Sequence, residues 1–390
     1  MLFRSAKEDA LIVSRVKRAG AVLLGKTNVP VGLGDFQSYN AIYGTTNNPW
    51  DVSRTPGGSS GGSAAALAAG FGPLSFGSDI GGSLRQPAHC CGVYAHKPTL
   101  GLVPVRGYNP PPAPPMPGYG DLAVAGPMAR RASDLALALD VIAGPDEQFE
   151  GIGYRLALPP ARHDNLKDFR ILVVDSHPLM PTGSAVRSAI GRLRERLARS
   201  GAKVAPTSEL LPNLTDSARL YMKLFGAATS VRASPDDFAQ SQRLASSQPA
   251  NDHALQTERA RGRVMSHRDW LAANAARVAL GQQWHALFRE WDVVVYPAAA
   301  VPAFPHDHSE PFEARQLEID GQAFPYFDAC AIWADPASTC GLPATAAPID
   351  RSPSGLPVGV QIIGPYLGDR TTIAFAELLE REFGGFTPPP

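Results

Sequence analysis

Two glycine- and serine-rich segments carry the residues with the clearest potential for chemistry. The first reads GGSSGGS over 57–63, and the second reads GSDIGGS over 77–83. In Gly81-Gly82-Ser83 a serine hydroxyl lies beside consecutive backbone amides, and glycine lets a backbone approach a ligand closely. Such amides are the makeup of an oxyanion hole, which stabilises the tetrahedral intermediate of acyl transfer. The charged residues Asp79 and Arg85 flank the glycines, which favours a built site over a plain linker.

Three other short motifs match the sequence, but the secondary structure predicted around them is not the one that each motif requires. The stretch 20–27 matches GxxxxGK[ST], but a helix is predicted before it and Asn28-Val29-Pro30 blocks one after it, so it cannot cradle phosphate. The segment at 57–61 matches GxSxG, yet a proline-containing loop precedes it where a nucleophile elbow needs a strand. His306 and His308 could face one way on a strand, but no further ligand cluster accompanies them. We therefore expect no metal.

Composition excludes several classes of function. The chain has 390 residues, with 36 Lys and Arg balanced by 36 Asp and Glu, which argues against nucleic acid or an anionic membrane as the main partner. No run of about 18 apolar residues exists, so we expect no membrane span. The four cysteines, Cys90, Cys91, Cys330 and Cys340, form no CxxC pair and are expected to be packed thiols in a reducing cytoplasm.

Periodicity in the first part of the chain predicts alternating elements. A helix is expected over 9–18, ended by Gly20, and a short buried strand over 21–24. The alanine-rich run 64–69 favours a tightly packed helix, and 108–118 (YNPPPAPPMPG) can only be an extended loop. A further helix is predicted after Ser133, a plausible N-cap, and ends at Gly144-Pro145.

The second part predicts a parallel unit. A strand over 170–174, a helix over 186–197 and an extended piece from Lys203 form a βαβ unit. Positions 206–290 are mostly helical, and strands at 293–296 and 358–363 precede a helix over 371–383. The fold class is therefore α/β, a mixed sheet surrounded by helices in a single large domain over 1–390. Its core is expected in 1–150 and 290–390, with a variable helical insertion over 150–290.

The chain resembles the amidase signature family over nearly its whole length. The glycine-rich segments occur together and in the family's order, which makes the match specific. The matching pieces are 19–28, 43–51, 56–63, 77–87, 97–99, 126–128, 340–344 and 355–365. The family hydrolyses carboxylic amides with a Ser–cis-Ser–Lys triad and no cofactor. The resemblance therefore implies an amidase acting on a small-molecule amide.

Carried over by motif, the resemblance assigns roles to particular residues. Ser83 would be the nucleophile, and Ser59 would be the cis-serine that relays its proton. The peptide bond entering Ser59 would be cis. The amides of Ile80, Gly81, Gly82 and Ser83 would form the oxyanion hole, and Asp79, Arg85 and Ser60 would support the loop.

The base is the one departure from the family. The resemblance expects a lysine further upstream of the nucleophile than this chain extends, so no catalytic lysine is assigned here. Lys26 and Lys97 match family positions that are structural. Three explanations stay open: a fragment or mis-called start, a naturally truncated and inactive homologue, or another lysine in the role. A missing N-terminal part predicts exposed apolar surface.

The sequence leaves the function open at a finer level. An inactive binding protein of the same fold and one component of a tRNA-dependent amidotransferase are alternatives, and a homodimer also stays open. The substrate is unreadable, because the loop 108–118 and the segment 206–290 would shape the acyl pocket. The candidate lining residues are Tyr221, Phe225, Trp270, Trp284 and Trp333.

Overall fold

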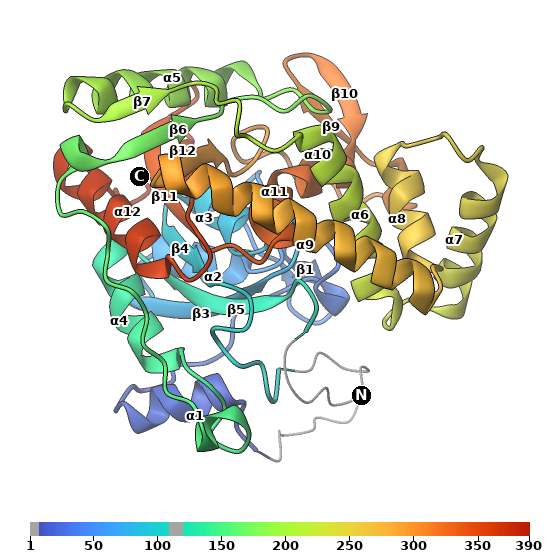
Figure 1. The fold of residues 1–390 in the computed structure, drawn as a ribbon, viewed down its shortest axis with the longest axis horizontal. Coiled ribbons are helices and arrows are strands. Elements are labelled where there is room, and N and C mark those ends of the chain that lie inside the picture. Colours follow the sequence, from blue (N-terminus) through green and yellow to red (C-terminus); the bar gives the residue numbers. More distant parts are fainter. Residues whose placement is uncertain (1–7, 109–119) are drawn as a thin grey trace.

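A mixed sheet of eight strands forms the centre of the computed structural model, which describes residues 8–108 and 120–390 (Figure 1). Its strand order is β3-β5-β4-β11-β12-β8-β6-β7. Strand β6 runs parallel to both β7 and β8, and every other neighbouring pair is antiparallel. The strands are β3 (Leu74–Asp79), β4 (Tyr94–Lys97), β5 (Val124–Ala129), β6 (Arg170–Val173), β7 (Lys203–Ala205), β8 (Val293–Pro297), β11 (Ala344–Arg351) and β12 (Pro357–Ile363).

Helices surround this sheet, and two short hairpins lie outside it. The hairpins pair β1 (Tyr39–Asn40) with β2 (Gly44–Thr45) and β9 (Gln316–Ile319) with β10 (Gln322–Pro325). The helices are α1 (Leu11–Arg18), α2 (Gly61–Ala68), α3 (Arg85–Cys91), α4 (Ala132–Ile142), α5 (Ser184–Arg199), α6 (Leu214–Ser230), α7 (Pro235–Ser247), α8 (Leu255–Arg263), α9 (His267–Glu290), α10 (Tyr326–Ala331), α11 (Asp335–Thr339) and α12 (Asp369–Phe383).

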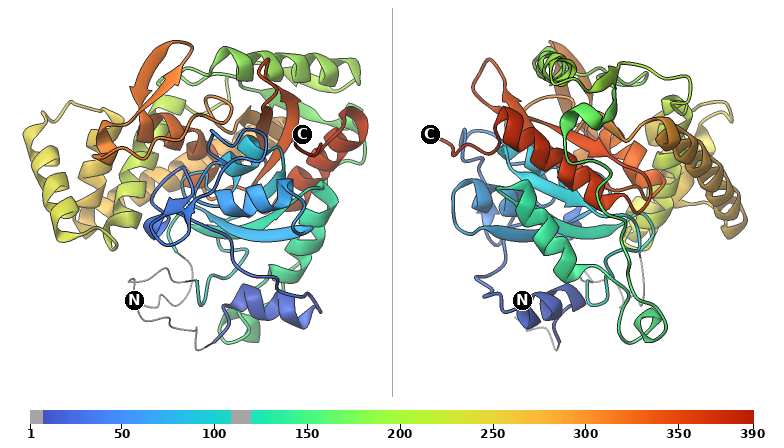
Figure 2. Two further views of the ribbon diagram at one scale, coloured as in Figure 1. Left: turned by 180° about the vertical axis from the view of Figure 1, so that it is seen from behind. Right: turned by 60° about the vertical axis from the view of Figure 1, so that its left-hand side comes forward.

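Both faces of the sheet are buried, as strand β8 illustrates. Successive side chains of a strand point to opposite faces. Val294 and Tyr296 belong to one apolar cluster, with residues of α6 and α9, whereas Val293 and Val295 belong to a second cluster with α4, α5 and α12. Figure 2 shows α9 on one side of the sheet and α4 and α12 on the other. The sheet is therefore the middle of three layers.

The fold class and most predicted elements are confirmed. The helix expected over 186–197 is α5, the predicted strands at 293–296 and 358–363 are β8 and β12, and the βαβ unit is parallel. The purely helical part begins at α6, because β6 and β7 of the range 150–290 belong to the central sheet. The proline-rich loop falls almost entirely outside the described residues.

Two local predictions are wrong. Residues 21–24 form no strand, and Val22 and Leu24 are 83% and 78% exposed, because no described segment offers this apolar run a ladder partner. Ser133 is not an N-cap, since α4 begins one residue earlier with Arg131 in the cap position and without a side-chain cap.

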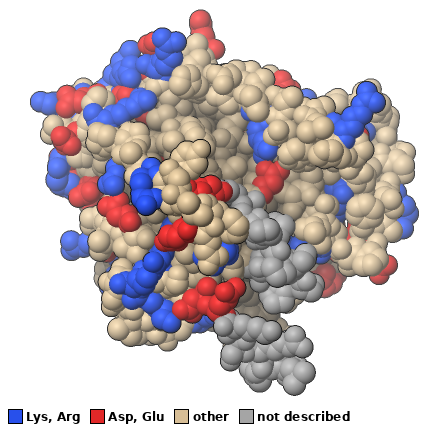
Figure 3. Space-filling view, turned by 60° about the horizontal axis from the view of Figure 1, so that its bottom comes forward, with Lys and Arg blue, Asp and Glu red and all other residues tan. Residues whose placement is uncertain are grey.

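The distribution of charged side chains, the lack of an apolar spanning helix and the state of the cysteines match what the sequence predicts. Lys, Arg, Asp and Glu side chains are interspersed on the face that Figure 3 shows. Within the described residues no helix is long and apolar enough to cross a membrane. The four cysteines, all within the described ranges, are free, and three of them are buried.

Candidate active site

Ser83 lies on the loop that joins β3 to α3. Strand β3 ends at Asp79, and the carboxylate of Asp79 turns back to accept hydrogen bonds from the amides of Gly82 (2.9 Å) and Leu84 (3.1 Å). Gly82 adopts a φ of +97°, a conformation that favours glycine. These two bonds fix the loop tightly, so that Ser83 is held only 7% exposed at the start of α3.

Arg85 locks Asp79 from the other side. Its Nε and Nη2 donate to the two carboxylate oxygens at 3.0 and 2.8 Å, a bidentate geometry. Burial alone would raise the pKa of Asp79, but the charge and hydrogen bonds of Arg85 lower it overall. The same guanidinium donates to Gln361 Oε1 (2.7 Å) and Ser338 Oγ (2.9 Å). Arg85 thus ties the loop to β12 and α11, two links that the sequence analysis missed.

The segment that carries Ser59 lies against this loop. The Gly58–Ser59 peptide bond is cis, as expected. The Ser60 amide donates to the Ser83 carbonyl at 3.3 Å. Gly57 packs so closely on α3 that a Cβ at its position would lie 2.7 Å from Pro87 Cα. The fold therefore brings the two serine-rich segments into direct contact.

The loop between β3 and α3 has free backbone amides, but one of the four expected in the oxyanion hole is already engaged. The amide of Gly82 is engaged by Asp79, which departs from its expected place in the oxyanion hole. The amides of Ile80, Gly81 and Ser83 have no acceptor among the described residues. Tyr221 on α6 donates its hydroxyl to the Ile80 carbonyl at 3.0 Å, which fixes the peptide plane before Gly81. Three amides therefore remain available to an oxyanion.

The two serine hydroxyls are not joined directly. Ser59 is 2% exposed, and neither its Oγ nor that of Ser83 forms a hydrogen bond within the described residues. Catalytic hydrogen bonds often tighten only when substrate is bound. The proton relay between these hydroxyls therefore stays a prediction.

Lys97 on β4 is the lysine nearest in character to a base. It is fully buried, and burial followed by the charge of Arg85 lowers its pKa to about 7. Its Nζ, however, donates to the carbonyls of Pro98 (3.0 Å) and Leu342 (2.8 Å), and to neither serine. Lys26 is exposed, and Lys17 pairs with Asp9 on the surface. No described lysine takes the position of a base.

The five candidate lining residues lie in three different places. Tyr221 and Phe225 lie next to the loop, since a Cβ at Gly81 would be 3.5 and 3.4 Å from them. Trp284 and Trp333 are buried core residues, and the Trp333 carbonyl accepts from Gln361, the partner of Arg85. Trp270 stacks on His267 at the start of α9.

Asp335 is the first residue of α11, the helix that also carries Ser338, a partner of Arg85. Its Oδ1 accepts from Ser217 (3.0 Å) and Thr339 (2.6 Å), and burial raises its pKa to about 7. The unfolded carboxyl titrates near pH 3.9, so between about pH 4 and 7 the folded state binds more protons and the free energy of unfolding falls as pH rises. We expect Asp335→Asn to remove this fall.

Urea denaturation at pH 5, 6, 7 and 8 measures the effect. The advantage of Asp335→Asn over the parent protein should grow with pH up to about 7. Asp164→Asn, at an exposed position, is the control and should follow the parent at every pH. A constant difference across this range would contradict the prediction.

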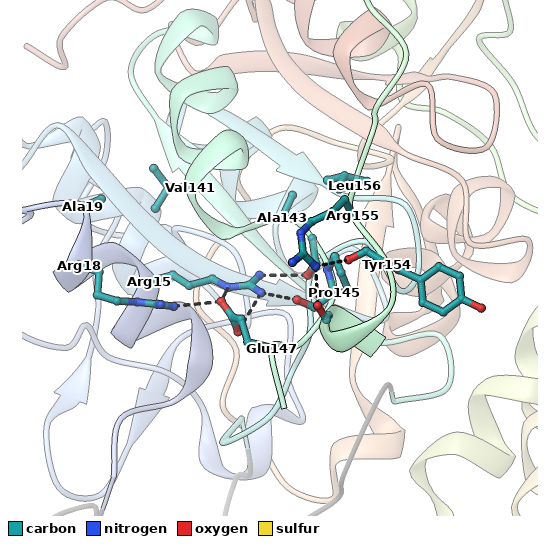
Figure 4. Close-up of a pocket in the computed structure, with 12 residues that line it drawn as sticks. Arg15, Arg18, Ala19, Val141, Ala143, Pro145, Glu147, Tyr154, Arg155 and Leu156 are labelled. Carbon is teal, nitrogen blue, oxygen red and sulfur yellow. Dashed lines mark hydrogen bonds and ion pairs between the residues drawn. The ribbon is translucent and has the colours of Figure 1, made fainter. Parts of the chain in front are cut away.

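A surface pocket of about 750 Å³ lies elsewhere, between α1, the end of α4 and the segment 144–156 (Figure 4). The buried guanidinium of Arg15 donates there to the carbonyls of Ile142 (2.6 Å) and Pro145 (2.7 Å). None of the serine-loop residues lines this pocket. Arg15 thus secures the end of α4 rather than the candidate site.

No group of three or more metal-ligating side chains occurs in the described part of the chain. His306 and His308 lie with ring centroids 5.6 Å apart, and His308 stacks on Tyr39 at 3.7 Å.

The fold and this loop together define a class of protein. A serine held beside free backbone amides, just after the edge strand β3 of the central sheet, has the makeup of an enzyme that acts on acyl compounds. The chain belongs to the Amidase family, whose model matches residues 2–373. It is thereby a member of a class of hydrolases that act on carbon–nitrogen bonds.

Individual relatives agree with this assignment. The chain is 33% identical over 395 residues to a glutamyl-tRNA(Gln) amidotransferase subunit of Deinococcus deserti, covering 95% of this chain and 76% of that one. It is 32% identical to the AtzE subunit of 1-carboxybiuret hydrolase from a Pseudomonas species, covering 92% and 73%. The solved glutamyl-tRNA(Gln) amidotransferase subunit of Thermotoga maritima superposes with a TM-score of 0.77 at 26% identity, over 98% of this chain and 79% of that one.

Proposed function

We propose that this protein hydrolyses a carboxylic amide through an acyl-enzyme on Ser83. The observation that supports this most is the contact between Ser60 and Ser83, which sets a second serine segment beside a loop with three free amides. Acyl transfer needs a nucleophile and donors aimed at the developing oxyanion, and one loop supplies both.

In the proposed reaction the Ser83 oxygen bonds to the amide carbon. Its proton passes through Ser59 to a base, and the amides of Ile80, Gly81 and Ser83 stabilise the negative charge on the former carbonyl oxygen. The carbon–nitrogen bond then breaks, the nitrogen takes up a proton, and ammonia or an amine leaves. Water attacks the ester and releases the acid and Ser83. The family resemblance implies a lysine as base, and no described lysine takes that role.

Covalent labelling tests the proposal without depending on turnover. A fluorophosphonate is expected to add once per chain, and peptide mapping should place the adduct on Ser83. Ser59→Ala should slow labelling, because the relay to the base is lost. Ser63→Ala is the matched control. Ser63 lies in the same glycine–serine run, but its hydroxyl is hydrogen-bonded to that of Thr27, so the variant should be labelled as the parent is. A folded chain that is not labelled, or is labelled elsewhere, would contradict the assignment.

A second candidate function is that of one component of an amidotransferase. Its support is that several relatives that match over 95% or more of this chain carry the name of a glutamyl-tRNA(Gln) amidotransferase subunit. Release of ammonia from glutamine, with no hydrolysis of simple alkyl amides, would favour this function. Equal or faster hydrolysis of alkyl amides favours the amidase.

A further inference from the structure

Ser38 lies just before β1, and its hydroxyl contacts the backbone on both sides of Ser59. The Ser38 Oγ is 3.1 Å from the Gly57 carbonyl oxygen and 3.3 Å from that of Ser59, so its one proton is shared between these two acceptors. The same oxygen accepts from the amide of Gly61 at 3.0 Å. Ser38 is 1% exposed, so bulk water does not compete for these hydrogen bonds.

The segment 57–61, which carries Ser59, rests directly on the backbone around Ser38. A Cβ at Gly61 would lie 2.5 Å from Ser38 Oγ, and one at Gly58 would lie 2.5 Å from the backbone nitrogen of Gln37. Contacts that short leave no room for a side chain at either glycine, because interiors are already close-packed. The position of Ser38 therefore sets the position of the segment 57–61.

Ser38 is itself fixed from two other parts of the chain. Its carbonyl accepts from the amide of Thr46, just after β2, at 2.9 Å. The side-chain amide of Gln37 exchanges two hydrogen bonds with the backbone of Asp307: Nε2 donates to the carbonyl at 2.6 Å, and Oε1 accepts from the amide at 3.0 Å. Ser38 thus has an anchorage that does not depend on the segment it contacts.

The Ser59 hydroxyl has no such anchorage, since it forms no hydrogen bond with any described residue. Its direction depends on the backbone that carries it. Proton transfer needs heavy atoms within about 2.6–3.2 Å of each other, and a misplacement of about 1 Å can cost roughly 100-fold in rate. A Ser59 hydroxyl that passes on the proton of Ser83 therefore needs its backbone to be held from outside.

We propose that Ser38 is a positioning residue, which directs the Ser59 hydroxyl toward Ser83 by bonding the backbone on either side of Ser59. The inference rests on the proposed function, which makes Ser59 the proton relay. The Ser38 oxygen is occupied by three backbone groups, so Ser38 acts through Ser59 and not on the substrate.

The rate of fluorophosphonate labelling of Ser83, measured against reagent concentration, tests this role. Ser38→Ala should lower the maximal labelling rate about tenfold or more and leave the half-saturating concentration unchanged, because Ser38 does not bind the reagent. In a Ser59→Ala background the same substitution should cause little further loss, since no hydroxyl is left to direct. Ser38→Cys, which keeps a weak donor in place, should lie between Ser38→Ala and the parent protein.

Ser241→Ala is the matched control. Ser241 is a buried serine of α7 whose hydroxyl donates to the Asp237 carbonyl at 2.9 Å, and its variant should be labelled as the parent is. Thermal unfolding checks that every variant is folded at the labelling temperature. Labelling of Ser38→Ala at the parent rate, or an equal further loss in the Ser59→Ala background, would overturn the inference.

Hydrogen exchange followed by mass spectrometry measures the same contact without any labelling. In Ser38→Ala, exchange should rise over 57–63, where the Gly61 amide loses its acceptor, and should stay unchanged over α12. Unchanged exchange over 57–63 would overturn the inference even if labelling were slower. A parent protein that is not labelled on Ser83 contradicts the proposed function instead, so the two failures are told apart.

Discussion

Replacing Ser83 with alanine is expected to lower amide hydrolysis about 10⁴-fold or more while leaving the fold intact. Removing a nucleophilic serine costs turnover on this scale in other acyl-transfer enzymes, because no neighbouring group replaces the covalent step. The structural cost should be small, since the Ser83 hydroxyl forms no hydrogen bond within the described residues and the loop is held by Asp79 instead.

Ammonia release from butyramide and succinamate measures the effect, with circular dichroism to check folding. Ser63→Ala, in the neighbouring serine run, should keep the parent rate. Turnover that survives in Ser83→Ala would exclude the acyl-enzyme. A folded parent protein without turnover on any amide would support the inactive binding protein of the same fold.

Local patterns in the sequence predicted most of the helices and strands. The strand expected over 21–24 is absent for a physical reason. The apolar spacing that identified α5 and α12 reports a face that packs on the sheet, and each helix can satisfy its backbone alone. A strand cannot, because its amides and carbonyls need a neighbour. The run 21–24 has the composition of a strand, but no described segment pairs with it, so it forms no regular element and stays exposed.

Local patterns likewise predicted some residues of the candidate site and missed others. The glycine-rich segments predicted which residues approach one another, and the contact between Ser60 and Ser83 agrees with that. The supports of Arg85 come from Ser338 and Gln361, more than 250 residues away along the chain, where no local pattern marks them.

Replacing Arg85 with methionine is expected to cost about 3–5 kcal/mol of the free energy of unfolding, the usual effect of removing one member of a buried ion pair. Both side chains are essentially inaccessible, with 1% of Arg85 and none of Asp79 exposed. The variant would leave the Asp79 carboxylate with only its two amide donors, and would strip Gln361 Oε1 of its partner.

Urea denaturation measures this cost, and Arg370→Met provides the comparison. Arg370 pairs with Asp140 at the same 2.8 Å, but 40% and 49% of these side chains are exposed, so its loss should cost no more than about 1 kcal/mol. Equal costs for the two variants would show that burial does not set the strength of the Arg85 pair.

The same variant separates a structural role from a role in positioning the loop. Asp79 holds the amides of Gly82 and Leu84 on either side of Ser83, so any shift of its carboxylate displaces the three amides that remain free. Arg85→Met should therefore slow fluorophosphonate labelling of Ser83 even at temperatures where the variant is fully folded. Asp79→Asn combined with Arg85→Met should recover part of the stability, because no buried charge is left unpaired, but not the labelling rate. Recovery of both together would mean that the ion pair stabilises the fold without orienting the loop.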